Sequence, residues 1–268
     1  MLLGTHRLPL WLAALIHCIL LNSLFASSTI VLVLSLLMDY NFIYSWARHD
    51  IFREFSIFTS STKIENFRHA QTLSRSGLES HILVVPNIPD EPVCKDRQNE
   101  QPFCFFYETL FTKLSVRLPL SSFEKGVLTI MNVAPAQLHP NSWAFITVFQ
   151  ILYTHFDITP RPDMLFYFFE FKPSKRTSWA SLYGVSGRGL LSLFQSSYKT
   201  SKGKFLKIQT DCLDFDLLTS LPLYWSPRPQ SQTPRSVDDL ENNELNGCTT
   251  LDQLDTIFET SVLLNLEP

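Results

Sequence analysis

The residues of this 268-residue chain with the clearest chemical potential form a basic run in its second half. Residues 172–207 contain eight lysine or arginine residues and no acidic residue, and aromatic residues are interleaved with them. The cations are Lys172, Lys175, Arg176, Arg188, Lys199, Lys202, Lys204 and Lys207, and the aromatic residues are Trp179, Tyr183, Phe194, Tyr198 and Phe205. Cations neutralise phosphates, and aromatic faces stack on unpaired bases. The run therefore indicates binding to single-stranded nucleic acid.

Six residues of the basic run are the candidate nucleic-acid contacts, namely Arg188, Tyr198, Lys199, Lys202, Lys204 and Lys207. Two other interpretations stay open. The run can be a solvated β-surface that the C-terminal part folds across, because residues 208–268 carry eleven acidic and two basic residues. It can also face a protein or an anionic lipid. The formal net charge of −3 conceals this separation, since residues 1–171 contain twelve basic and fourteen acidic residues.

No other pattern in the chain predicts catalysis, a metal or a cofactor. The cysteines are Cys18, Cys94, Cys104, Cys212 and Cys248, and no two of them have the C-x-x-C spacing of a zinc site. Residues 184–189, GVSGRG, lack the order of a dinucleotide or phosphate-binding loop and predict a turn. His155 precedes Asp157, but no G-x-S-x-G nucleophile motif accompanies the pair, which favours a structural role at a helix end.

The enzymatic alternative is a metal-dependent transposase or nuclease. Such an enzyme needs several carboxylates that project from a rigid scaffold toward the same ions. The available acidic residues are Asp157, Asp163, Glu170, Asp211, Asp214 and Asp216. Nothing in their spacing indicates which of them converge, so we favour a non-enzymatic protein.

The elements that must position these residues begin with a helical core segment at about residues 119–171. Ser121 and Glu124 have the spacing of a capping box. In this motif the Ser hydroxyl accepts a bond from one free backbone N–H, and the Glu side chain reaches back to another. The first helix is therefore expected to start here, and Pro135 is expected to end it.

Two further helices complete the helical core segment. Asn141 is a good N-cap for a second helix, whose residues 143–153 are apolar nearly all round, as expected of a buried helix. Pro162 suits the first turn of a third helix, which we expect to run through Phe171.

Short strands are predicted after the helices, at about residues 178–210. The three runs, each bounded by turn residues, are 178–186, 190–194 and 204–210. For residues 103–114, periodicity does not decide between helix and strand. Near the C-terminus, Thr250 and Gln253 predict the start of a last amphipathic helix. Together these elements predict an α+β fold.

An apolar segment precedes these elements, because residues 8–38 contain no charged residue. About 20 apolar residues suffice to cross a bilayer core as a helix, so we expect a transmembrane helix or signal anchor and a membrane location. A cleaved signal peptide with residues 8–21 as its apolar region is one alternative. The other is a segment that never meets a membrane, which would leave the protein in the nucleus or cytoplasm.

Three stretches in the middle of the chain carry a family resemblance. They are Phe103–Phe111, Val116–Phe123 and Leu128–Phe149, and the most distinctive part is NVAPAQLHPNSW at Asn132–Trp143. Together with Phe166–Phe169, Ser196–Lys199 and Leu221–Trp225, they resemble the plant transposase domain of gypsy-type retroelements. The resemblance covers about residues 78–227 and brings no established catalytic residues. Tyr107, Arg117, Pro119, Leu138, Pro140 and Trp143 fit the family pattern, and we interpret them as core, turn and cap residues.

Composition, charge and chain-breaking residues, together with the resemblance, predict a chain of four parts, of which the apolar segment is not part of the family pattern. We expect an apolar N-terminal segment at 1–40, an irregular or linker region at 41–102 with a short helix near 46–58, a transposase-like domain at 103–227, and an acidic tail at 228–268 with a short helix. The predicted function is non-enzymatic binding of nucleic acid or protein by a retroelement-derived protein. A membrane-anchored protein and a metal-dependent transposase or nuclease are the alternatives.

Overall fold

The computed structural model describes residues 47, 51, 54–75, 82–95, 101–173, 179–191, 199–210, 220–252 and 260. The chain divides into two compact units, Met1–Trp46 and Ala47–Pro268, and all described residues belong to the second. Among the described residues, no helix combines the length and apolarity needed to span a bilayer. The predicted membrane segment at 8–38 lies outside them.

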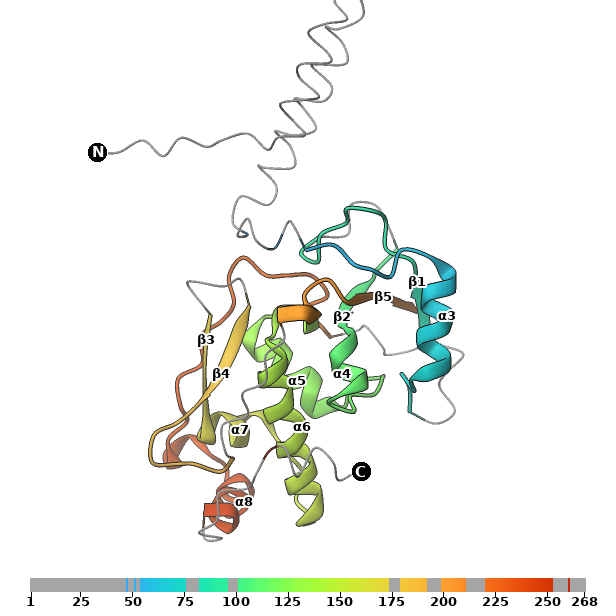
Figure 1. Cartoon of the computed structure of the whole chain (residues 1–268). Helices are drawn as coiled ribbons and strands as arrows, with labels where there is room; N and C mark the ends of the chain where they lie inside the picture. The colour runs from blue at the N-terminus through green and yellow to red at the C-terminus, as the bar shows by residue number, and fades with distance from the viewer. Residues whose placement is uncertain are drawn as a thin grey trace, which may run out of the picture. The chain divides into compact units, whose positions relative to one another are not determined.

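The described part is a mixed α/β fold whose strands are all antiparallel within two small sheets. Its helices are α3 (Ser61–Ala70), α4 (Glu108–Thr112), α5 (Ser122–Met131), α6 (Pro140–His155), α7 (Pro162–Phe168) and α8 (Asn242–Asp252) (Figure 1). Its strands are β1 (Ile82–Val85), β2 (Cys104–Tyr107), β3 (Phe169–Pro173), β4 (Ala180–Gly184) and β5 (Phe205–Thr210). Short 3₁₀ turns are η2 (Pro135–Gln137), η3 (Lys199–Ser201) and η4 (Val237–Asp239).

β5 is the central strand of the three-stranded sheet, whose order is β1–β5–β2. Lys207 of β5 lies opposite Val85 of β1 and Phe105 of β2. The side chains of residues 205–208 are buried on both faces of the sheet. The end of the basic run is therefore interior, and it lies between β1 and β2.

α5 starts as the sequence predicts. The Ser121 hydroxyl accepts a bond from the Glu124 backbone N–H at 3.2 Å, and the Glu124 carboxylate accepts one from the Ser121 N–H at 2.7 Å. The helix ends before Pro135, because Asn132 adopts a left-handed conformation (φ 51°) at its C-cap. Asparagine tolerates this conformation better than most residues and commonly ends helices.

α6 is buried nearly all round, which confirms the prediction for residues 143–153. Phe149 stacks on Phe123 of α5 and on Tyr153 of its own helix, with ring centroids 5.6 and 4.2 Å apart. The predicted N-cap is wrong. His139 caps the helix instead, because its Nδ1 accepts the Asn141 backbone N–H at 3.0 Å while Pro140 occupies the first turn.

α7 starts at Pro162 as predicted but ends at Phe168, three residues earlier than expected. The chain then becomes strand β3, in which Phe169 and Phe171 are buried while Glu170 and Lys172 point outward. This alternation suits a strand, and β3 pairs with β4 from Phe169↔Gly184 to Pro173↔Ala180. The predicted strand region at 178–210 is confirmed for β4 and β5.

Other predicted elements need correction. The region 41–102 is not irregular throughout, since it contains α3 and β1, and its described residues 54–58 are not helical. β1 escapes prediction because it is four residues long and pairs with a strand far along the chain. Residues 103–114 form a strand and then a helix. Thr250, the predicted start of the last amphipathic helix, lies inside α8, which begins at Asn242, and residues 253–259 of that predicted helix lie outside the described residues.

The buried face of α8 explains that error. It contains Glu244, Gly247, Cys248 and Leu251, only one of which is a large apolar residue. A Cβ at Gly247 would lie 2.4 Å from Met164 Cε, so this face lies very close to α7. The close approach is possible because glycine has no side chain. A face that packs through glycine shows no amphipathic pattern in the sequence.

Candidate nucleic-acid interface

Three of the four candidate lysines, Lys199, Lys202 and Lys204, lie in a turn that leads into β5. This lysine turn comprises residues 199–204 and starts with η3. The Gly203 carbonyl accepts the Ile57 N–H at 2.9 Å, and the Lys204 carbonyl accepts the Glu108 N–H at 2.8 Å. Backbone bonds from two distant segments therefore fix the turn at the end of the sheet where β5 begins.

Two lysines of the turn have partly exposed side chains. Lys204 is 44% exposed, and its Nζ lies 3.4 Å from a Glu108 carboxylate oxygen. Lys202 is half-buried, and its Nζ lies 5.4 Å from the centroid of the Trp179 ring. A surface ion pair such as Lys204–Glu108 contributes only about 0–1 kcal/mol, so a phosphate can compete for its cation.

Lys207 lies in the interior, so the prediction that it belongs to an exposed basic face is wrong. Its Nζ lies 2.8 Å from Glu91 Oε1 and 4.1 Å from the centroid of the Phe103 ring. Lys95 contacts the same Glu91 oxygen at 2.8 Å. The Lys207 and Glu91 side chains are 4% and 1% exposed, so this ion pair cannot reach a ligand.

Arg188 serves another part of the molecule. Its guanidinium lies over the Tyr167 ring, 4.2 Å from the centroid, and donates to the carbonyls of Tyr167 and Arg235. It therefore ties the turn after β4 to α7 and to the C-terminal segment rather than to the lysine turn. Tyr198 lies outside the described residues, and the structure describes the backbone of Lys199 but not its side chain.

The aromatic residues of the basic run are not a continuous stacking surface. Trp179 and Phe205 are 6% and 0% exposed, and the Trp179 indole N–H donates to the Tyr107 hydroxyl at 3.1 Å. Tyr183 is exposed, while Phe194 lies outside the described residues. The predicted stacking through Trp179 and Phe205 is wrong, because both residues pack in the core.

A group of exposed apolar residues beside the lysine turn escaped the sequence analysis. Phe55, Ile57 and Ile88 are 39%, 46% and 55% exposed, and we call them the apolar ledge. Between the first two, Ser56 is buried and its hydroxyl donates to the Phe205 carbonyl. This arrangement inverts the usual rule that apolar side chains point inward, so the hydrophobic pattern of the segment predicts the opposite orientation.

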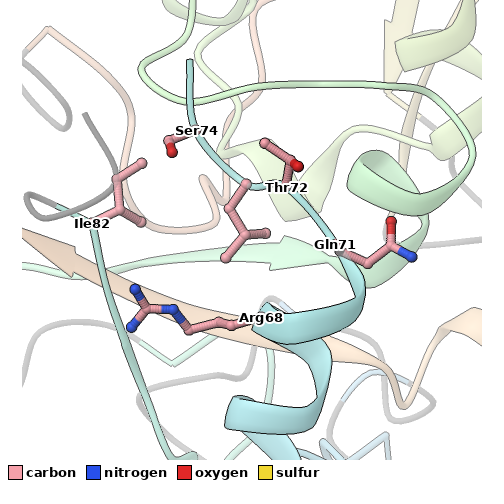
Figure 2. Close-up of a pocket in the computed structure, with 6 residues that line it drawn as sticks. Arg68, Gln71, Thr72, Ser74 and Ile82 are labelled. Atoms are coloured by element: carbon pink, nitrogen blue, oxygen red, sulfur yellow. The ribbon is translucent and has the colours of Figure 1, made fainter. Parts of the chain in front are cut away.

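A cavity of about 220 Å³ lies between the C-terminal end of α3 and β1. It is lined by Arg68, Gln71, Thr72, Leu73, Ser74 and Ile82, and Figure 2 shows the Arg68 side chain extending toward the strand that carries Ile82. These lining residues supply a guanidinium, an amide and two hydroxyls but no carboxylate, imidazole or thiol. They therefore contain no conventional general base.

Three buried phenol or thiol groups, those of Tyr107, Cys104 and Cys248, are poor nucleophiles. Burial raises the pKa of Tyr107 and of the Cys104 thiol far above neutral, and it raises the pKa of Cys248 to about 11. The protonated thiol or phenol is the unreactive form. Tyr107 accordingly acts as a buried hydrogen-bond partner for Trp179.

The carboxylates considered for a metal-dependent nuclease divide into two sets. Asp163 pairs with Arg235 at 2.8 Å, Glu170 pairs with Lys172 at 2.6 Å, and Asp157 lies in a left-handed turn after α6. Within the described ranges, no three His, Cys, Asp or Glu residues are placed to share a metal ion. Asp211, Asp214 and Asp216 lie outside those ranges.

Two structural predictions about suspected chemical motifs are confirmed. Residues 184–189 form a turn in which the Arg188 N–H donates to the Val185 carbonyl at 3.1 Å and Gly187 has φ 81°. A positive φ favours glycine at that position. His155 is the last residue of α6, as its predicted helix-end role requires.

Comparison with known proteins bears on the segment from β2 to β3. Residues 105–173 match the family model described as "Putative gypsy type transposon". These residues are similar to that family, and we call them the transposon-related segment. The match confirms the family resemblance over its central part. It says nothing about whether the source is a plant. No curated protein and no solved structure matches the chain.

The residues that carried the resemblance have structural roles in the transposon-related segment. The Trp143 indole N–H donates to the Pro135 carbonyl at 3.0 Å, so this tryptophan fastens η2 to α6. Arg117 donates to the Val116 carbonyl at 3.1 Å, and Leu138 is fully buried. These contacts agree with the interpretation of the motif as core, turn and cap residues.

Proposed function

We propose that this chain is a transposon-derived, non-enzymatic protein that binds nucleic acid through the lysine turn. The supporting observation is the fixed position of residues 199–204 at the end of the sheet, with Lys202 and Lys204 partly exposed. Backbone bonds to Ile57 and Glu108 hold the turn, so its backbone needs little reordering when its lysines meet a phosphate. Preorganised cations lose less conformational entropy on binding than mobile ones.

Binding would proceed by exchange of weak surface partners for phosphates. Lys204 leaves the Glu108 carboxylate, and the phosphate releases condensed counterions as it meets the ammonium group. The affinity should therefore fall with rising salt. Lys207 takes no part, because Glu91 holds it in the interior.

The test is a fluorescence-anisotropy titration of the full chain with a labelled 30-nucleotide single strand over a series of salt concentrations. K202E/K204E should weaken binding about tenfold or more at low salt. Loss of two phosphate contacts should also reduce the slope of log K against log salt by about 1.4. K172E/R228E changes the charge equally at exposed positions elsewhere and should leave both quantities unchanged. Salt-independent binding, or equal losses in the two double variants, would contradict the proposal.

The same samples distinguish binding from cleavage. We expect the labelled strand to stay intact in the presence of Mg²⁺ or Mn²⁺. Metal-dependent cleavage that disappears in Asp211→Asn or Asp214→Asn would replace the binding proposal with the nuclease alternative.

Membrane insertion through residues 8–38 remains a separate proposal that rests on the apolar sequence. Carbonate extraction of full-length tagged protein from cells tests it. Retention in the membrane pellet supports an anchor, whereas release into the supernatant supports the nuclear or cytoplasmic alternative.

A further inference from the structure

Hydrogen bonds with Phe205 of β5 and with Asn87 hold the part of the apolar ledge that contains Phe55 and Ile57. The Ser56 hydroxyl donates to the Phe205 carbonyl and accepts the Phe58 N–H at 3.1 Å. The Asn87 side chain donates to the carbonyls of Phe58 and Phe205, at 3.1 Å each. These bonds turn Ser56 inward and leave Phe55 and Ile57 outward, so their exposure is a fixed feature of the fold.

The backbone of the lysine turn touches the apolar ledge. Ile57 donates to the Gly203 carbonyl at 2.9 Å, and a Cβ at Gly203 would lie 3.0 Å from the Phe55 carbonyl oxygen. On the other side, Lys63 of α3 donates to the Ile57 carbonyl at 2.9 Å. Lys63 and the lysine turn therefore both contact the backbone of the segment that exposes Phe55 and Ile57.

This combination indicates which kind of nucleic acid the lysine turn binds. We propose that the site binds single-stranded nucleic acid, with an unpaired base packed on Phe55 beside Ile57 and the adjacent phosphates on Lys63, Lys202 and Lys204. The inference rests on the proposed function. A duplex presents phosphates but keeps its base faces stacked, so it gains nothing from Phe55, whereas an unpaired base has a free face for an aromatic side chain.

The charges around the ledge limit how much affinity phosphates alone can supply. Carboxylates of Glu54, Asp90 and Glu108 lie on the same segments as the ledge and the turn and equal the three lysines in number, so these groups together carry no net charge. The base contact therefore supplies affinity that the phosphates alone do not.

The experiment compares a labelled 30-nucleotide strand with a blunt-ended duplex made from that strand and its complement, using the full chain and matched variants. Phe55→Ser should weaken single-strand binding about tenfold and leave duplex binding unchanged, while Phe55→Trp should retain single-strand binding. Tyr183→Ser is the control, because Tyr183 is 47% exposed on β4 and should not contribute. Thermal melting of each variant checks that the fold is intact.

The outcomes separate the two proposals. If no nucleic acid binds in a salt-dependent way, the proposed function fails. If binding is sensitive to K202E/K204E but Phe55→Ser weakens binding of the single strand and of the duplex equally or not at all, only the single-strand inference is overturned. Tighter binding of an acidic amphipathic peptide than of the oligonucleotide, with loss in Phe55→Ser, would also overturn it and assign the ledge to a protein partner.

Discussion

Lys204 and Lys207 lie three residues apart, and the fold places them in opposite environments. Lys204 lies at the end of the lysine turn with 44% of its side chain exposed, and its ammonium group forms an ion pair with the partly exposed Glu108 carboxylate. Lys207 lies on the central strand with 4% exposure, against Glu91 and the Phe103 ring. The same residue type thus serves a surface that can exchange partners and a core that cannot.

The largest expected effect comes from removing the buried cation. Lys207→Met leaves Glu91 with one cation, Lys95, and should destabilise the protein by about 3 kcal/mol, since breaking a buried pair leaves an inadequately compensated charge. Lys204→Met should change the free energy of unfolding by less than about 0.5 kcal/mol. Urea unfolding followed by tryptophan fluorescence measures both. Equal costs would erase the contrast between the two lysines.

His139 adds a third basic residue to this comparison of Lys204 with Lys207. Burial favours its neutral form. Desolvation lowers its pKa to about 4, and its Nδ1 accepts the Asn141 N–H, which requires an unprotonated nitrogen. In the unfolded chain the pKa is near 6.5. The unfolded state therefore binds a proton more readily, and the stability contribution present above pH 6.5 is lost as the pH falls toward 4.

His139→Asn tests this pH dependence, since asparagine can cap α6 but does not titrate. Between pH 6.5 and 4, the wild type should lose about 2 kcal/mol more stability than the variant. Thermal or urea unfolding across this pH range gives the difference. His69→Asn, at an exposed position of α3, is the control and should follow the wild type. Parallel curves for wild type and His139→Asn would show that the cap is insensitive to acid.

Two capping boxes, one with a buried partner and one exposed, extend the contrast between interior and surface to the neutral side chain of serine. Ser121 caps α5 together with Glu124, which is 5% exposed, whereas Ser236 forms the same motif with Asp239 in the exposed turn η4. Ser121→Ala should cost about 1 kcal/mol. Ser236→Ala should cost clearly less, because water can replace the lost bonds. Urea midpoints that shift equally would indicate that burial adds nothing to this cap.

The interactions that were predictable from sequence are those made between near neighbours. The capping box at Ser121 spans three residues, and the all-round apolar composition of α6 identified it as a buried helix. The turn at 184–189 follows from glycine chemistry, and the transposon-related segment follows from its motif. Each of these features is encoded within one short window of the chain.

The features that escaped prediction depend on partners far along the chain. Glu91 contacts Lys207 across 116 positions, and Ser56 contacts Phe205 across 149 positions. No local pattern reveals that the first pair removes a lysine from the surface or that the second turns Phe55 outward. The basic run therefore contains more cations than it exposes, and the candidate site is confined to the lysine turn at the start of β5.

The smallest expected effect on stability tests whether Lys204 is an exchangeable cation. Glu108→Gln removes the carboxylate that lies 3.4 Å from Lys204 Nζ but keeps the backbone N–H that donates to the Lys204 carbonyl. The fold should be nearly unaffected, since exposed pairs contribute about 0–1 kcal/mol. Single-strand affinity should rise about two- to fourfold at low salt, because the lysine no longer has to leave a carboxylate, and the gain should vanish at high salt. Glu170→Gln, which removes the partner of Lys172 on β3, should leave the affinity unchanged. An equal gain in both variants would mean that net charge alone governs binding, and that the lysine turn is no more a phosphate site than any other exposed lysine.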